Sequence, residues 1–283
     1  MKTLYINNNQ YLLRQSWREC SEEIILDALP LVNFVQAENN AKKRAHFWVG
    51  LLRAVLKEVP DELFYKLSGV QMFNLRRHFK WLLETRIDFR PFEFFEFEGQ
   101  RYILPRENFA DTSAIELAMS NIYFLSFTND KSPNEKAVLN LIATLCRPER
   151  SDLEAFRASS NWNGDQRQEP NSVVADERAA HFERLNIGVV IAILQYFESM
   201  NAAFLGRYQS CFEAGDTNET PMYQNGEGWL ALLEDVAETG VHGTFNQVCA
   251  ENAHTVFLYI KHKTLKNKRE AVAEAADDDD DNT

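Results

Sequence analysis

Apolar residues recur every three or four positions along most of the chain, which is the spacing of an α-helix with one buried face. Phe47, Leu51, Val55 and Val59 follow this spacing, for example. The pattern predicts helices over residues 21–36, 42–59, 69–84, 112–127, 132–146, 178–213, 229–238 and 244–268. The middle of the 178–213 helix is apolar nearly all round, so we expect that helix to be central and buried.

Two segments depart from the helical period and have the composition of β-hairpins. Residues 1–15 contain two short runs of strand-forming residues around an Asn-rich turn. Residues 92–105 alternate aromatic and acidic side chains, with Glu98 and Gly99 at the turn and Pro105 at the end of the second strand. The sequence therefore predicts a mainly α protein, a multi-helix soluble bundle with two small β-hairpins.

Capping residues indicate where two of the helices begin. Thr112 or Ser113 can cap the helix that follows, because Glu116 stands at capping-box spacing. Ser132 is the expected cap of the next helix, with Pro133 at its first position. Both starts are thus assigned from side chains that can accept the unpaired backbone N–H groups of a first helical turn.

The helix predicted to begin near residue 132 also has a clear end. Leu141, Ile142 and Leu145 form the apolar face of its last turns. Arg147 suits the negative end of the helix dipole, and Pro148 cannot continue the helix. We expect the three apolar residues to lie in the core and the Arg-Pro pair to stop the helix.

Composition divides the chain into four parts. Residues 148–176 mix charged residues with Asn, Ser and Gly and contain few apolar residues, so they are expected to form a flexible loop. This loop separates an N-terminal helical domain with two hairpins, residues 1–147, from a C-terminal helical domain, residues 177–269. Residues 270–283 include five consecutive aspartates and are expected to be a disordered acidic tail.

The charge balance limits the kinds of partner. The net charge is −12, and five of the negative charges lie in Asp277–Asp281. An acidic chain is a poor binder of phosphate backbones, and the basic run at residues 261–269 fits better as a helix C-terminus beside the aspartates. The apolar run Ile187–Leu194 is far shorter than the roughly 20 residues that span a bilayer. We expect no nucleic-acid and no membrane partner.

Motifs that carry chemistry are absent from the sequence. There is no Walker loop, GxGxxG, HExxH, GxSxG or CxxC. Asp111 with Glu116, or Glu234 with Asp235 and Glu238, could be interpreted as carboxylate pairs, but helix first turns and solvated helix faces explain them better.

The four cysteines lie far apart in the sequence and are expected to be reduced thiols. Cys146, Cys211 and Cys249 have no histidine at a spacing that supports nucleophilic catalysis. Among the histidines, only His254 and His262 lie within about two helical turns, and no acidic or cysteine ligand accompanies them. The sequence therefore predicts no catalytic, cofactor-binding or metal-binding residue and no cofactor.

The order of these elements resembles that of uncharacterised tail-region proteins of bacteriophages and prophages, especially from Bacteroidota. The likeness covers most of the chain in layout and a few short motifs by residue. Those motifs are Ser16-Trp17-x-Glu19 at a helix start, Tyr102–Pro105 at a strand end, the capped helix with Glu116, the helix end Leu145–Pro148 and the aromatic segment Tyr196–Leu205. Cys146 stands where the family pattern has an aromatic residue.

This resemblance implies a non-enzymatic tail-assembly protein in the host cytoplasm, such as a chaperone that shields the apolar helices of the tape-measure protein. The expected partners are other phage tail proteins, namely the tape-measure or tube protein, and the resemblance implies no oligomeric state. A structural minor tail or connector component of the virion is one alternative. An enzyme whose site is assembled only in the folded chain is the alternative from another class.

Overall fold

Helices dominate the structure, a computed structural model that describes residues 2–6, 9–160, 162–212, 223 and 226–280, with side chains as far as residue 271. Helix accounts for 62% of the residues, and the two sheets are small and antiparallel. The prediction of a mainly α fold with two small hairpins is confirmed.

The chain forms two compact units. Unit 1 contains residues 1–93 and 184–199, and unit 2 contains residues 94–183 and 200–283. This division differs from the predicted one, because the first unit is built from two segments that are far apart in the sequence.

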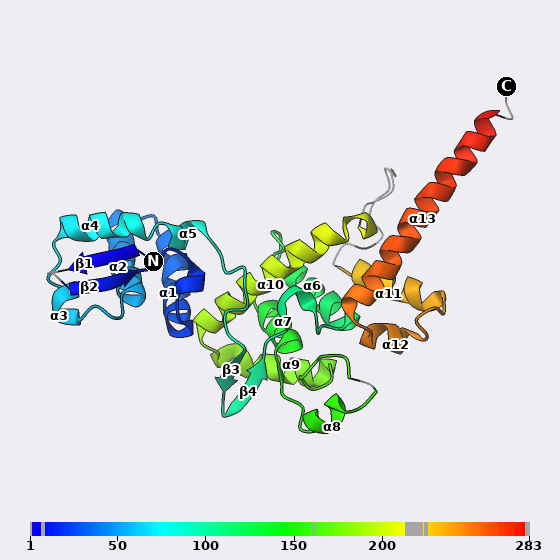
Figure 1. The fold of residues 1–283 in the computed structure, drawn as a ribbon, viewed down its shortest axis with the longest axis horizontal. Helices are drawn as coiled ribbons and strands as arrows, with labels where there is room; N and C mark the ends of the chain where they lie inside the picture. The colour runs from blue at the N-terminus through cyan, green and yellow to red at the C-terminus, as the bar shows by residue number, and fades with distance from the viewer. Residues whose placement is uncertain (1, 7–8, 161, 213–222, 224–225, 281–283) are drawn as a thin grey trace. The chain divides into compact units, whose positions relative to one another are not determined.

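Unit 1 begins with the hairpin expected within residues 1–15 (Figure 1). Its strands pair antiparallel, with Lys2 opposite Leu13, and the turn residues 7–8 lie outside the described residues. The elements of this part are β1 (Lys2–Ile6), β2 (Asn9–Leu13), η1 (Trp17–Glu19), α1 (Glu22–Ala37), α2 (Ala41–Val55), α3 (Asp61–Phe64), α4 (Gly69–His78) and α5 (Trp81–Glu84).

Two tryptophans join the start of unit 1 to α5. The Trp17 and Trp81 rings meet edge to face with centroids 5.3 Å apart. Each indole N–H donates a 3.2 Å hydrogen bond to a carbonyl across the contact, Trp17 to Thr85 and Trp81 to Arg14. Buried indole groups need such partners, so the pair contributes apolar area without leaving an unsatisfied donor.

Unit 2 begins with the second predicted hairpin, and a third short strand extends its sheet. Tyr102 of β4 lies opposite Pro148 of β5, a pairing that the sequence did not predict. The elements are β3 (Phe94–Phe97), β4 (Gln100–Ile103), η2 (Glu107–Phe109), α6 (Ala114–Phe127), α7 (Ala137–Leu145), β5 (Arg147–Pro148), α8 (Leu153–Arg157), α9 (Ser172–His181), η4 (Gln209–Cys211), α11 (Gly228–Glu238), α12 (Phe245–Ala250) and α13 (Ala253–Asp280).

The helix predicted over residues 178–213 is interrupted, so that prediction is wrong in its extent. After α9 the chain passes through η3 (Phe182–Arg184) and then enters α10 (Ile187–Arg207), which runs from unit 1 into unit 2. Asn186 explains the new start, because its side-chain Oδ1 accepts a 2.7 Å hydrogen bond from the Gly188 N–H, as an N-cap does. α10 is long and apolar enough to cross a membrane, but more than half of its apolar window is buried in the protein, as in a core helix.

Capping and core predictions around α6 and α7 have mixed outcomes. Ser113 is the N-cap of α6 and forms a capping box with Glu116, as expected. Ser132 does not cap α7, which begins five residues later at Ala137. The apolar residues near the end of α7 are buried as predicted, and the helix ends at Leu145.

The two segments expected to lack structure contain regular elements. Within residues 148–176 the chain forms α8 and the start of α9, and Glu149 pairs with Arg167 in an antiparallel bridge. At the C-terminus, α13 continues to Asp280, and residues 281–283 lie outside the description. The first segment therefore contains more regular structure than its composition suggests.

A glycine of α10 tests the packing of unit 1. A Cβ at Gly188 would overlap the Leu26 carbonyl of α1, whereas a Cβ at Gly206 of the same helix meets nothing within 4 Å. We expect Gly188→Ala to lower the free energy of unfolding by about 1–3 kcal/mol through overpacking. Gly206→Ala, the matched control, should raise it by up to about 1 kcal/mol through helix propensity. Urea unfolding measures both, and equal effects would contradict the close contact.

Candidate functional site

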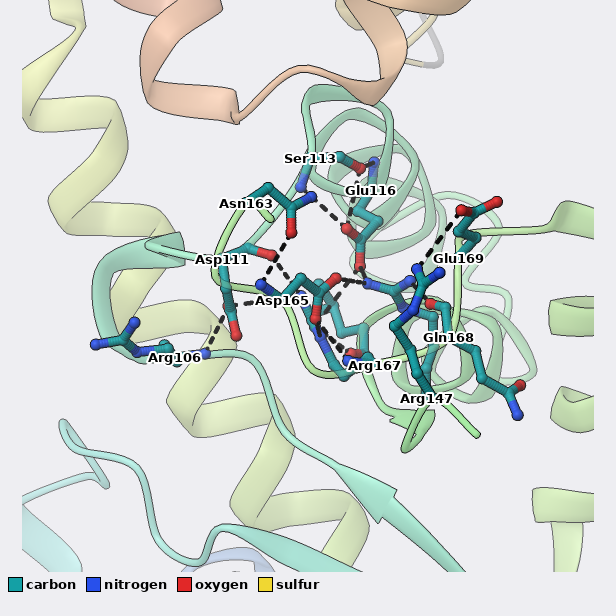
Figure 2. A network of polar contacts seen from close by, with 12 residues as sticks. Arg106, Asp111, Ser113, Glu116, Arg147, Asn163, Asp165, Arg167, Gln168 and Glu169 are labelled. Atoms are coloured by element: carbon teal, nitrogen blue, oxygen red, sulfur yellow. Dashed lines mark hydrogen bonds and ion pairs between the residues drawn. The ribbon is translucent and has the colours of Figure 1, made fainter. Parts of the chain in front are cut away.

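Five charged side chains of unit 2 are buried together, which is rare enough in a protein to mark a candidate site. Each is less than one tenth exposed, and they come from four segments that are distant in the sequence (Figure 2). They are Asp111, Glu116, Arg147, Asp165 and Arg167, here called the buried charge cluster.

Glu116 reaches the cluster from the first turn of α6. One carboxylate oxygen accepts hydrogen bonds from the Ser113 N–H at 3.0 Å and the Ser113 hydroxyl at 2.9 Å. The other accepts from Arg147 Nη2 at 2.6 Å. Glu116, identified from the sequence as the capping-box partner of Ser113, thus has a second function, because it also fixes the strand that follows α7.

Arg147 is the link between that strand and the segment 163–168. Its Nη2 group lies 2.7 Å from Asp165 Oδ2 in addition to Glu116, and its Nη1 group donates to the Gln168 carbonyl. The sequence suggested that this arginine complements the dipole of α7. The structure instead buries it as the shared partner of two carboxylates.

Arg167 is completely surrounded by acceptors. Its Nε donates to Asp165 Oδ1 at 2.7 Å, Nη1 to the Leu145 carbonyl at 2.6 Å and Nη2 to the Asp111 carbonyl at 2.7 Å. These bonds hold the end of α7 and the residues before α6 against segment 163–168. These contacts are the physical reason why segment 163–168 is held by the rest of unit 2, although composition predicts a flexible loop over residues 148–176.

The electrostatics of the cluster follow from these pairings. Burial alone would raise the pKa of Asp165, but the charges of Arg167 and Arg147 outweigh it and lower that pKa. Burial would likewise lower the pKa of Arg167, but Glu116, Asp111 and Asp165 raise it. All five groups have an opposite charge within 3.6 Å. The pairing offsets the cost of removing each ion from water. An arrangement of this kind is suited to a structural role, in which it fixes segments of the chain.

A cavity of about 420 Å³ lies beside the cluster, between α6, α7 and the start of α9. Glu116, Arg147 and Arg178 supply its charged wall. Arg178 is only 9% exposed, donates a 2.6 Å hydrogen bond to the Ala143 carbonyl, and has its pKa lowered by burial. The volume is in the range of small-ligand sites, and the guanidinium could contact a small anion. Most of the other lining residues are apolar or aromatic, and three are small and polar. The full set is Ile115, Met119, Tyr123, Ala143, Thr144, Pro170, Asn171, Ser172, Val173 and Ala175.

The cysteines weighed as nucleophiles are poorly suited to that chemistry in the fold. Cys146 is fully buried. Burial raises the pKa of the Cys211 and Cys249 thiols, and it raises the pKa of Cys20 to about 12. A thiol with a raised pKa carries little of the reactive thiolate at neutral pH.

The other candidate groups are dispersed. His254 contacts the Tyr208 hydroxyl at 2.9 Å, and His262 is exposed. Glu234, Asp235 and Glu238 are exposed on α11, as a solvated helix face would be. Asp111 and Glu116 do lie close together, but around Arg167. In the described part of the chain, no group of three or more His, Cys, Asp or Glu side chains could hold a metal ion.

Sequence reasoning missed three members of the cluster: Arg147, Asp165 and Arg167. Glu116 was identified as a capping partner, and its possible pairing with Asp111 was attributed to the first turn of a helix. The available signal was the spacing of Asp165 and Arg167, two residues apart, which places opposite charges on one side of an extended segment. That signal is weak, because the same spacing is common on exposed strands.

Comparison with known proteins adds no relative. No family model matches the chain, and comparison with curated proteins and with solved structures finds no match.

The first test of the cluster removes one charge. Arg147→Met should lower the free energy of unfolding by about 3–5 kcal/mol, because Glu116 and Asp165 would be left buried without that partner. The control is Arg101→Met, which breaks an exposed 2.9 Å pair with Glu96 in the same unit and should change stability by less than about 1 kcal/mol. Chemical denaturation compares them, and similar losses would show that the cluster does not support the fold.

The second test uses pH. The folded-state pKa of Asp165 lies below its unfolded value, so its contribution to stability is complete above about pH 4 and is lost as the pH falls through the folded pKa. Asp165→Asn should therefore be much less stable than the wild type at pH 7, and the difference should shrink below about pH 4. Urea titrations at pH 7, 5, 3.5 and 2.5 measure it. A difference that stays constant would contradict the assigned shift.

Proposed function

We propose that this chain is a non-enzymatic protein that acts in the assembly of a phage or prophage tail by binding another tail protein, as a chaperone of the tape-measure protein. The layout shared with phage tail-region proteins supports the biological setting. The observation that carries the binding role is the exposure of two phenylalanine side chains on the helices of unit 1.

The name aromatic surface is used here for the exposed Phe34 of α1 and Phe73 of α4, with the half-buried Phe47 of α2 that contacts Phe34. Phe34 and Phe73 are 51% and 55% exposed. Phe34 stacks on Phe47 with ring centroids 5.3 Å apart, and Arg76 covers both Phe73 and the neighbouring Trp48. Side chains of this size usually lie in a core, and their exposure on a helix face is typical of a surface that contacts another protein.

The buried charge cluster is compatible with this role. Its carboxylates and guanidinium groups are paired with one another, so they serve the fold and leave the exposed aromatic side chains as the feature that a partner would contact. A tape-measure protein presents apolar helices before the tube forms, and an aromatic helix surface is suited to cover them.

The test is capture of tail proteins by the tagged chain from cells in which phage tails are assembling. The wild type should retain the tape-measure or tube protein, and Phe34→Ser with Phe73→Ser should lose it while the fold is kept. The control is Val241→Ser, which removes a 63% exposed apolar side chain from unit 2. Capture that is unchanged in the double variant, or absent in the wild type, would contradict the proposal.

The alternative role is a structural component of the tail. Mass spectrometry of purified particles separates the two roles, because a chaperone is absent from finished particles. Detection at a fixed stoichiometry would replace the chaperone role with that of a minor tail or connector protein.

A further inference from the structure

The charge of the protein is divided unequally between its two units. Unit 1 contains fifteen Lys and Arg and twelve Asp and Glu, a net charge of +3. The whole chain carries −12, so unit 2 carries −15. The acidic composition of the chain therefore conceals a basic unit.

The positive charge of unit 1 is concentrated around α2 and α4. Residues 39–57 and 65–83 contain nine Lys and Arg and no Asp or Glu. Arg53 and Lys57 have carboxylate partners at 2.6–2.7 Å. The other seven form no ion pair with another described residue, and they are Lys42, Lys43, Arg44, Lys66, Arg76, Arg77 and Lys80.

A ring contact connects the two helices at one of these cations. The Arg76 guanidinium of α4 lies 5.5 Å from the Trp48 ring centre of α2. Arg44 is one helical turn before Trp48 and so lies on the same face of α2. Lys43 is likewise one turn before Phe47, which belongs to the aromatic surface. Arg76 also lies 5.1 Å from the ring centre of the exposed Phe73. These cations and the aromatic surface are together called the basic aromatic surface.

The start of α2 is an unfavourable place for these cations. Its first turn contains Lys42, Lys43 and Arg44 and no acidic residue. The positive end of a helix dipole favours Asp or Glu there, as α1 has with Glu22 and Glu23. Three cations at this position lower the stability of the free helix, and negative charges bound from outside would offset the repulsion.

We propose that the basic aromatic surface binds an acidic amphipathic helix of the partner protein. The proposal rests on the protein-binding function above and adds the chemistry of the partner. Acidic side chains of the bound helix would contact the cations of α2 and α4, and its apolar side chains would cover Phe34 and Phe73. The phenylalanines, together with Val70 at 71% exposure, favour a protein segment over a nucleic acid, because they require an apolar counterpart.

The first experiment replaces two cations by acids. Lys42→Glu with Lys43→Glu should raise the Tm by a few degrees, since acidic groups at a helix N-terminus are favourable. The same variant should bind an acidic amphipathic peptide at least tenfold more weakly than the wild type. The matched control is Lys263→Glu with Lys266→Glu on α13, which should leave binding unchanged. Unchanged binding of the peptide by the variant would overturn the proposal.

The binding probe is a synthetic helical peptide of about 20 residues with leucines on one face and glutamates on the other, followed by fluorescence anisotropy. Binding should weaken as salt increases, and the same peptide with lysines in place of the glutamates should not bind. Failure of the acidic peptide to bind the wild type would overturn the proposal. Tighter binding of a single-stranded oligonucleotide through the same lysines would also overturn it and assign the surface to nucleic acid.

Capture from phage-producing cells distinguishes this inference from the proposed function. If the Lys42→Glu, Lys43→Glu variant still retains the tail protein, the acidic-partner inference is wrong and the assembly role stands. If the acidic peptide binds but no tail protein is captured by the wild type, the surface is assigned correctly and the assembly role is wrong.

Discussion

A guanidinium group without access to water depends on acceptors inside the protein, and Arg167 sets this constraint for unit 2. Its bonds reach the end of α7, the residues before α6 and Asp165 on its own segment. Arg147 then depends on the same Asp165 and on Glu116 in the first turn of α6. One set of charges thus fixes the positions of three segments, namely the start of α6, the end of α7 and residues 163–168. Such clusters are sensitive to the loss of one member, because the remaining ions stay buried.

Hydrophobic period predicted both hairpins and most of the longer helices, since these patterns are local and are read from neighbouring residues. It did not predict the short α3 and α8, and it merged α4 with α5 and α12 with α13, which the structure separates. Ser113 and Glu116 were found for the same reason, as a cap and its partner lie within one turn. The cluster could not be predicted in this way. Arg147 lies 31 residues from Glu116 and 18 from Asp165, and nothing in the sequence indicates which distant charges share a buried space. The exposed basic aromatic surface was overlooked for another reason, because the net charge of the chain averages over two units of opposite sign.

Residues 148–176 show where composition misleads. A segment with few apolar residues cannot stabilise itself by hydrophobic burial, but it can be held by a few ions that find partners elsewhere. Asp165 and Arg167 supply that connection, and the pairing of Glu149 with Arg167 adds backbone structure. The break between α9 and α10 was missed for a different reason. The apolar pattern continues through the break, but the side chain of Asn186 caps a new helix there.

The discontinuous make-up of unit 1 has a consequence for synthesis on the ribosome. Its first 93 residues are made long before residues 184–199, which supply Gly188 against α1 and the Gln195 side chain that accepts a hydrogen bond from the Ile87 N–H. At roughly 5–20 residues per second, the nascent helices wait on the order of ten seconds for these contacts. During that interval the apolar side of α1 that later receives α10 is uncovered, and the whole 94–183 insertion emerges first. Unit 2 waits as well, because it includes α13, which is made long after residues 94–183. Unit 1 can therefore be completed once residue 199 has been made, before unit 2 receives α13.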